Sequence, residues 1–193
     1  MLSKKLKNKH IILASGSPRR QELLKGLDID FSIKVKSIDE VYPQSLKAEE
    51  ITNYLAELKA EAFDNLLKDN EIVITSDTIV WHQDKPLEKP KNEAQAIEML
   101  QELSNKVHKV ITSVCIKSND KQKVFFDVTK VHFKALTNNE ISYYVKKYKP
   151  FDKAGSYGIQ EWIGFIGVTK LEGSYFNVMG LPVHKLYEEL LIF

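Results

Sequence analysis

A serine-rich turn followed by two arginines is the first segment whose residues could do chemistry. At residues 15–20 the chain reads SGSPRR: an apolar run leads into a tight glycine turn, and Pro18 suits the first position of a helix. Free N–H groups and the positive dipole end of a helix attract anions, and arginine offers fork-shaped donors that suit phosphate. The pattern predicts a phosphate site in this turn. The alternative is an ordinary capped surface helix with two solvated arginines.

Two acidic segments could supply metal ligands or a general base. Asp77 follows the apolar run 71–75 in Ser-Asp-Thr, so we expect it at the carboxyl end of a buried strand. Such a carboxylate can hold Mg²⁺ or accept a proton from water. Asp39 and Glu40 form an acidic pair in a predicted loop, and with Asp77 they could complete a divalent-metal site. The alternatives are a turn-capping aspartate and a solvated charge pair.

Two lysines and a glycine-rich stretch are further candidates. Lys59 lies at the edge of an apolar helical stripe, where its long side chain could reach into a cleft, and Lys89 lies in the proline-restrained segment 87–90. In DKAGSYGIQ, residues 152–160, close glycines let the backbone approach a ligand, and Gln160 offers one donor and one acceptor for a base edge. Solvated lysines and a plain glycine turn are the alternatives.

Alternating strands and helices must position these residues. Apolar runs predict strands, and stripes at steps of three and four predict helices. The expected strands are 10–14, 31–35, 71–75, 107–116 and 124–133; the expected helices are 18–26, 46–68, one capped by Asn92, one capped by Thr137 and one after Pro182. We expect loops at 39–43 and 84–92, and loops with short strands over 152–180. This order predicts an α/β fold with a mixed sheet.

Composition limits the classes of protein to which the chain could belong. Its 193 residues and 43% hydrophobic content suit one globular domain, residues 1–193. A net charge of +2 is too balanced for a general nucleic-acid coat, and the single cysteine excludes a disulfide framework. Apolar runs are too short for a membrane span or a signal peptide, so we expect a cytoplasmic protein without membrane or nucleic-acid partners.

The order of the motifs carries more information than any one of them. Leu13–Leu24 (LASGSPRRQELL) is followed by SDTIV at 76–80, LEKP at 87–90, DKAGSYGIQ at 152–160, and then GSY and GLP near the carboxyl end. This series resembles the Maf family of nucleoside triphosphate pyrophosphatases, once named for an association with septum formation. The stretch ending at Gln160 is similar to that of the dTTP/UTP subfamily. Glu161 and Trp162 depart from the family pattern, which has a glycine after this glutamine.

The resemblance implies a fold and a set of roles. It implies a Maf/ITPase-like α/β fold with a mixed central sheet flanked by helices, two lobes with a substrate cleft, a divalent metal (Mg²⁺ or Mn²⁺) and often a homodimer. By position, Asp77 matches the catalytic acidic residue and Glu40 matches a polar residue that lines the cleft, and we expect Glu40 and Asp77 to hold the metal. The residues that match substrate-binding positions are Ser15, Arg19, Arg20, Lys59 and Lys89; those that match positions tied to base choice are Arg19, Thr78 and Gln160.

The implied reaction is hydrolysis of dTTP and UTP between the α- and β-phosphates, giving the nucleoside monophosphate and pyrophosphate. Modified pyrimidine triphosphates are an alternative set of substrates. A non-catalytic, nucleotide-binding regulator of cell division would use the same anion site and is the alternative function. Acidic residues near that site speak against the regulator, because they repel a triphosphate unless a metal bridges them.

Overall fold

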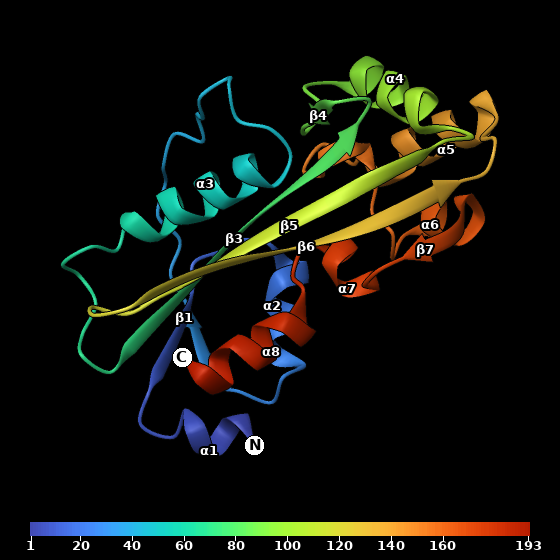
Figure 1. The fold of residues 1–193 in the computed structure, drawn as a ribbon. Coiled ribbons are helices and arrows are strands. Elements are labelled where there is room, and N and C mark those ends of the chain that lie inside the picture. Colours follow the sequence, from blue (N-terminus) through green and yellow to red (C-terminus); the bar gives the residue numbers. More distant parts are fainter. The chain divides into compact units, whose positions relative to one another are not determined.

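Helices and strands alternate along the chain in the computed structural model, which describes all 193 residues (Figure 1). The helices are α1 (Leu2–Lys5), α2 (Pro18–Lys25), α3 (Glu49–Glu61), α4 (Glu93–Leu103), α5 (Asn138–Tyr148), α6 (Trp162–Gly167), α7 (Tyr175–Met179) and α8 (Val183–Ile192), with a 3-10 turn η1 at Ala154–Ser156. The strands are β1 (His10–Leu13), β2 (Phe31–Ile33), β3 (Glu71–His82), β4 (Lys85–Leu87), β5 (Val107–Lys117), β6 (Gln122–Phe133) and β7 (Val168–Glu172). No helix combines the length and the apolar character needed to cross a membrane.

The strands form one mixed sheet. Their order is β2-β1-β3-β5-β6-β7, and β4 pairs with β3 outside this path. Strand β1 pairs in parallel with β2 and β3, whereas β3 with β4 and β6 with β7 are antiparallel. The predicted α/β fold with a mixed sheet is therefore confirmed.

The chain divides into two compact units, each made of separate stretches of sequence. Unit 1 contains Met1–Asp77, Thr112–Asp127 and Gly180–Phe193, and unit 2 contains Thr78–Ile111 and Val128–Met179. The three long strands β3, β5 and β6, green to yellow in Figure 1, each contribute residues to both units. The predicted single domain over residues 1–193 stays a prediction.

Unit 1 buries the apolar faces of β1, α2, α3 and α8. On α3 the predicted stripe is buried at Ile51 and Leu55. The helix is shorter than predicted, because we expected 46–68 and it covers Glu49–Glu61. The chain leaves the helical conformation at Asn65, whose φ is 58°, and the last member of the predicted stripe, Leu66, is exposed.

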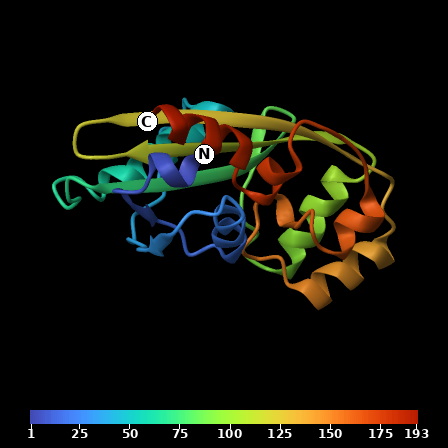
Figure 2. The ribbon, with the colours of Figure 1, turned by 90° about the horizontal axis from the view of Figure 1, so that it is seen from below.

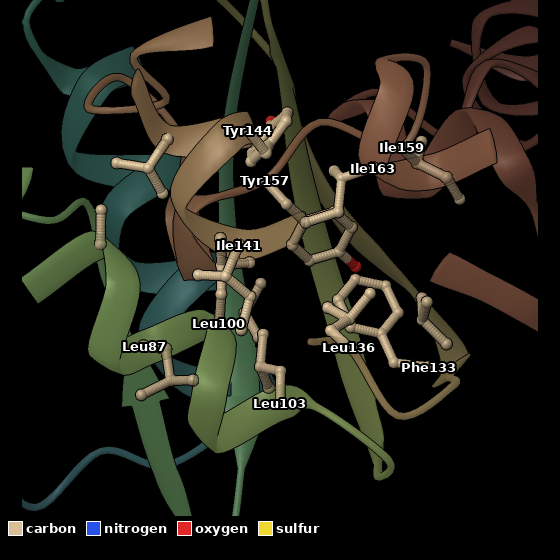
Figure 3. Packing of buried hydrophobic residues seen from close by; sticks show 14 of the residues in the cluster. Leu87, Leu100, Leu103, Phe133, Leu136, Ile141, Tyr144, Tyr157, Ile159 and Ile163 are labelled. Carbon is tan, nitrogen blue, oxygen red and sulfur yellow. The ribbon is translucent and has the colours of Figure 1, made fainter. Parts of the chain in front are cut away.

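Unit 2 has its own core around α4 and α5. Figure 2 shows α4 beside α5, and these helices are in contact. In Figure 3, Leu100 of α4 and Ile141 of α5 point toward one another, and Tyr157 lies against Phe133. Both predicted helix caps are confirmed: Asn92 Oδ1 accepts from the Gln95 N–H, and Thr137 forms a capping box with Glu140.

Three predicted boundaries were wrong. Strand β3 does not end at 75 but continues through Ser-Asp-Thr to His82, because Ile79, Val80 and Trp81 are strong strand formers. The predicted loop at 84–92 contains β4, which pairs with the end of β3. The glycine-rich stretch at 152–180, where we expected loops with short strands, holds the short strand β7 but also the unpredicted η1, α6 and α7.

A buried histidine in unit 2 makes stability depend on pH. His108 Nε2 lies 2.7 Å from the Tyr157 hydroxyl oxygen, and the ring packs edge-on against Phe133. Burial, together with the charges of His82 and His132, lowers the pKa of His108 to about 3. The unfolded chain binds a proton at this residue near pH 6.5 and the folded chain does not. We therefore expect the free energy of unfolding to fall by roughly 1 kcal/mol per pH unit below pH 6.5.

The variant His108→Gln should remove the part of the pH dependence of unfolding that His108 causes, and it keeps a polar partner for the Tyr157 hydroxyl. Urea unfolding at pH 7 and pH 5 measures this effect. Between these two pH values the free energy of unfolding of the variant should fall by about 2 kcal/mol less than that of the wild type. The exposed His184, changed to Gln, is the control and should keep the wild-type slope. Parallel losses in wild type and His108→Gln would contradict the prediction.

Candidate active site

A lysine that bridges two carboxylates is the centre of the candidate site. Lys59 Nζ lies 2.7 Å from Asp77 Oδ1 and 3.0 Å from Glu40 Oε1. The side chains of Lys59 and Asp77 are only 15% and 10% exposed, so this ion pair is largely shielded from water. Glu40 and Asp77 lie near each other, as predicted, because both carboxylates contact the Lys59 ammonium nitrogen. All three residues belong to unit 1.

Three elements bring these side chains together. Lys59 comes from the last turn of α3 and Glu40 from the loop between β2 and α3, whereas Asp77 lies within β3. Pairing of β1 with β3 ends at Ile74, and pairing with β4 begins at Val80. Asp77 therefore lies between the two pairings rather than after the end of the strand, which corrects its predicted position.

Arg20 fastens the first part of α2 beside Asp77. Its Nε donates to the Gly180 carbonyl oxygen and its Nη1 to the Ser76 carbonyl oxygen, each at 2.8 Å. Burial lowers the pKa of Arg20, the nearby Asp77 charge opposes that shift, and Arg19 adds to it. The guanidinium therefore lies in the field of the candidate catalytic carboxylate. We expect the Arg20 guanidinium to hold the backbone at Ser76 and Gly180 in place and also to attract an anion.

The serine turn before α2 is held by its own hydrogen bonds. Ser15 is buried, its Oγ accepts from the Ser17 N–H at 3.3 Å, and its carbonyl oxygen accepts from Gln21 Nε2 at 3.3 Å. Pro18 is the first helical residue, as predicted, and Ser17 precedes it, but the Ser17 side chain makes no capping bond. The Ser15 hydroxyl fixes the turn instead. Arg19, in the first turn of α2, is half-buried.

The other predicted residues lie in unit 2, where two motif loops meet. The Gly155 N–H donates to the Glu88 carbonyl oxygen at 3.2 Å, which joins segment 152–160 to segment 87–90. Gly155 has φ +66°, and a Cβ there would lie 2.7 Å from Val80 Cγ2, so only glycine fits. This close approach places the 152–160 loop on β3 beyond Thr78.

Each of the three predicted side chains in unit 2 has a different environment. Lys89 is exposed, Thr78 is half-buried and directly follows Asp77 in β3, and Gln160 is half-buried. The Gln160 Oε1 atom is itself buried without a hydrogen-bond partner. Units 1 and 2 therefore each hold part of the predicted set.

Several groups that build the site were not assigned roles from the sequence. The Ser76 and Gly180 carbonyl oxygens hold Arg20, and the Ser76 hydroxyl also donates to Gly180 at 3.3 Å. Backbone acceptors carry no signal in residue type, so only the GLP motif at 180–182 could have drawn attention to Gly180. The contacts of Glu161, described below, were also missed.

The donor set determines what kind of metal this site could hold. No group of three or more His, Cys, Asp or Glu side chains is arranged to hold a metal ion. Glu40 and Asp77 provide two carboxylates that already converge on a cation, the Lys59 ammonium. Mg²⁺ is commonly held by one or two carboxylates, with water or phosphate oxygens in its remaining positions. The residues fit such an ion and do not form a complete protein cage.

Comparison with known proteins gives one family and a set of full-length relatives. The family model described as Maf-like protein matches residues 10–193. A dTTP/UTP pyrophosphatase of Flavobacterium johnsoniae is 62% identical over 190 residues, which cover 98% of each chain. Proteins of the same name from Flavobacterium psychrophilum and Christiangramia forsetii are each 57% identical; the matches cover 99% and 98% of this chain and 98% and 97% of theirs.

A solved structure supports the fold independently. The Staphylococcus aureus Ham1 protein matches with a TM-score of 0.55 at 18% identity, covering 94% of this chain and 98% of the other. At this identity the likeness concerns the arrangement of helices and strands alone. It agrees with the α/β architecture described above.

Proposed function

This chain belongs to the Maf-like protein family, as its motifs predict, and on that premise we propose that it hydrolyses nucleoside triphosphates, dTTP and UTP above others. The products are the nucleoside monophosphate and pyrophosphate. One observation supports the proposal most: two carboxylates share the Lys59 ammonium, and the half-buried Arg20 beside Asp77 is bound to backbone carbonyls. Full-length relatives named dTTP/UTP pyrophosphatase support the substrate choice.

Positive charge must balance the triphosphate. The start of a helix contributes only about half a unit of charge, so side-chain cations are needed as well. We assign the phosphates to the Ser15 turn with Arg19 and Arg20, to Lys59, and to Lys89. Arginine donates in pairs to phosphate oxygens, and lysine acts as a compact point charge.

Asp77 is the proposed general base. Its carboxylate takes a proton from a water molecule as that water attacks the α-phosphorus, and the bond from this phosphorus to the bridging oxygen breaks. The leaving pyrophosphate carries the bonding electrons, and the cations around it stabilise the added charge. Lys59 holds the Asp77 side chain in position through its 2.7 Å contact.

Glu40 and Asp77 would hold the divalent metal, Mg²⁺ or Mn²⁺. When bound, such an ion neutralises phosphate charge and acts as a Lewis acid. Because the two carboxylates do not form a complete cage, we expect the metal to bind mainly together with the nucleotide.

Removal of metal should therefore abolish turnover without destabilising the protein. We expect excess EDTA to stop pyrophosphate release and to leave the melting temperature in the absence of nucleotide within about 1 °C of the untreated protein, since a ligand stabilises only when it is bound. Differential scanning fluorimetry and a release assay measure the two effects. A fall of several degrees with EDTA would indicate a resident structural metal.

Base choice is assigned to Gln160, Thr78 and Arg19. Uracil and thymine share an edge with a carbonyl at position 4 and an N–H at position 3, whereas cytosine carries an amino group at position 4. A site that leaves buried polar groups unpaired rejects the wrong base strongly. We expect UTP and dTTP to be cleaved faster than CTP, and purine nucleotides to be poor substrates.

The test is incubation with each nucleoside triphosphate, including 7-methyl-GTP and 5-methylated pyrimidine forms, with Mg²⁺ or Mn²⁺. Phosphate is detected with and without added inorganic pyrophosphatase. A signal that requires pyrophosphatase and is strongest for UTP and dTTP supports the proposal. Direct phosphate release would contradict cleavage at the α-phosphorus, and metal-independent binding without release would favour the nucleotide-binding regulator.

Three broader expectations accompany the activity. We propose that residues 1–193 work as one Maf-like domain, because the family match spans residues of both units. The resemblance to the family supports a cytoplasmic homodimer, and the net charge of +2 gives no reason to expect a nucleic-acid partner. Light scattering after gel filtration measures the oligomeric state.

A further inference from the structure

A carboxylate at an unexpected position lies at the centre of a buried network in unit 2. Glu161 stands where the motif pattern predicts a glycine. Its Oε2 accepts a hydrogen bond from the Tyr144 hydroxyl, and its Oε1 lies 3.1 Å from Lys153 Nζ. The Lys153 and Glu161 side chains are only 9% and 19% exposed. Lys153 also contacts Asp152 at 2.8 Å, so it is shared between two carboxylates.

The same network holds the backbone that carries Gln160. The Gly158 N–H donates to the Tyr144 hydroxyl oxygen at 3.0 Å, so Tyr144 fastens both Gly158 and Glu161. A Cβ on Gly158 would lie 3.1 Å from Gln160 Nε2 and 3.1 Å from Glu161 Oε2. The Gln160 amide nitrogen and the Glu161 carboxylate therefore face the same side of Gly158, where a Cβ would lie 2.9 Å from Glu161 Cδ.

This arrangement selects the orientation of the Gln160 amide. An amide has one donating and one accepting end, and a carboxylate attracts the donating end and repels the accepting end. With Nε2 on the Glu161 side, the remaining end is Oε1. That atom is buried and has no hydrogen-bond partner. A buried acceptor without a partner costs free energy, and a ligand donor that uncovers and reaches the atom on binding removes that cost.

We propose that Glu161 is a positioning residue for base choice: held by Tyr144 and Lys153, it fixes the Gln160 amide so that Oε1 accepts from the imide N3–H of uracil or thymine. Cytosine has no hydrogen at N3 and fails to supply this donor. The inference rests on the proposed function, since it assumes that Gln160 faces the base. Glu161 is not among the residues assigned to substrate binding. The inference gives a chemical role to this residue, which stands where the family pattern has a glycine.

The first test is the variant Glu161→Gln, which keeps size and removes the charge that orients the amide. We expect kcat/KM for UTP to fall about tenfold, the typical effect of one hydrogen bond, mainly through a higher KM. The ratio of kcat/KM between UTP and CTP should fall by a similar factor. Glu172→Gln is the matched control: Glu172 also pairs with lysines in unit 2 but lies on β7, and its change should leave the ratio unaltered.

A double-mutant cycle separates positioning from general structural damage. In a Gln160→Ala background, Glu161→Gln should change the UTP to CTP ratio less than twofold, because no amide remains to be oriented. Tyr144→Phe, which keeps the ring and the carboxylate, should shift the ratio in the same direction as Glu161→Gln. If Glu161→Gln keeps the wild-type ratio within twofold, or lowers it equally without Gln160, the proposal is wrong.

Binding measurements keep this inference distinct from the proposed function. Calorimetry with the non-hydrolysable α,β-methylene analogues of UTP and CTP reports discrimination without turnover. A wild type that prefers the uridine analogue but cleaves no triphosphate would overturn the proposed function alone. Loss of that preference in Glu161→Gln would still support the positioning role, and its retention would overturn the role.

Discussion

Asp77→Asn should reduce kcat for UTP by at least roughly 10²-fold, and by as much as about 10⁴-fold, because a general base typically contributes that range. The change keeps the shape of the side chain and removes the charge that accepts the proton. Lys59 retains Glu40 as a partner at 3.0 Å, so we expect the fold to persist. Steady-state kinetics with a coupled pyrophosphatase assay measures the loss.

A matched lysine–aspartate pair elsewhere in unit 1 provides the control. Asp127 Oδ1 lies 2.7 Å from Lys185 Nζ, and the Asp127 side chain is 13% exposed, close to the 2.7 Å contact and 10% exposure of Asp77, although Lys185 is more exposed than Lys59. Asp127→Asn should cost comparable stability and leave kcat near that of the wild type. Turnover of Asp77→Asn within tenfold of the wild type would remove Asp77 from the role of general base.

Gly164→Ala should destabilise the protein by about 3 kcal/mol, at the upper end of what overpacking costs. A Cβ at this position would lie 2.6 Å from the Ile159 carbonyl carbon and 2.9 Å from its Cα, and these are backbone atoms that cannot swing away. Helix propensity alone predicts the opposite sign, a gain of about 1 kcal/mol for alanine in α6. Thermal unfolding should show a melting temperature lower by roughly 10 °C.

Gly167→Ala, at the end of the same helix, is the matched control. Its Cβ would lie 3.2 Å from Leu136 Cδ2, the far end of a side chain that can shift, so we expect at most a small loss. If Gly164→Ala melts at or above the temperature of Gly167→Ala, the backbone of Ile159 does not pack on α6 as described.

The sequence predicted those elements whose signals are local. Short apolar runs located β1, β5 and β6, and side-chain caps at Asn92 and Thr137 located the starts of α4 and α5. These signals depend on the residue and its near neighbours, so they remain valid without knowledge of the tertiary structure.

Predictions were wrong where tertiary pairing outweighs local propensity. Ser-Asp-Thr at 76–78 is typical of a turn, yet β3 continues through it because strand partners pair before and after it. The glycines of 152–180 predicted loops, but Gly164 lies inside α6, where its missing side chain permits close backbone packing. For β3 the deciding contacts come from strands distant in the sequence, whereas for Gly164 the contact is with the nearby Ile159 and depends on how the chain folds back there.

The sequence predicted which charged residues belong to the candidate site, but it did not predict which side chains contact one another. The position of Lys59 at the edge of an apolar stripe predicted a side chain that reaches into a cleft, and in the structure this side chain contacts Asp77 and Glu40. Nothing in the sequence around Glu161 indicated Tyr144 or Lys153, because α5 brings Tyr144 to it from 17 residues away. The assigned roles of these residues in binding and catalysis stay predictions.

The division of unit 1 into three stretches has a consequence for how the protein is made. Unit 1 needs Gly180–Phe193, so it stays incomplete on the ribosome until that stretch has been translated and has emerged. The Arg20 side chain must wait for the Gly180 carbonyl, 160 residues later in the chain. All of unit 2 is translated before that point, and its contacts can form first. A nascent chain stalled before Gly180 would therefore expose an unfinished arginine site, and a pause there would delay the active enzyme rather than release a working fragment.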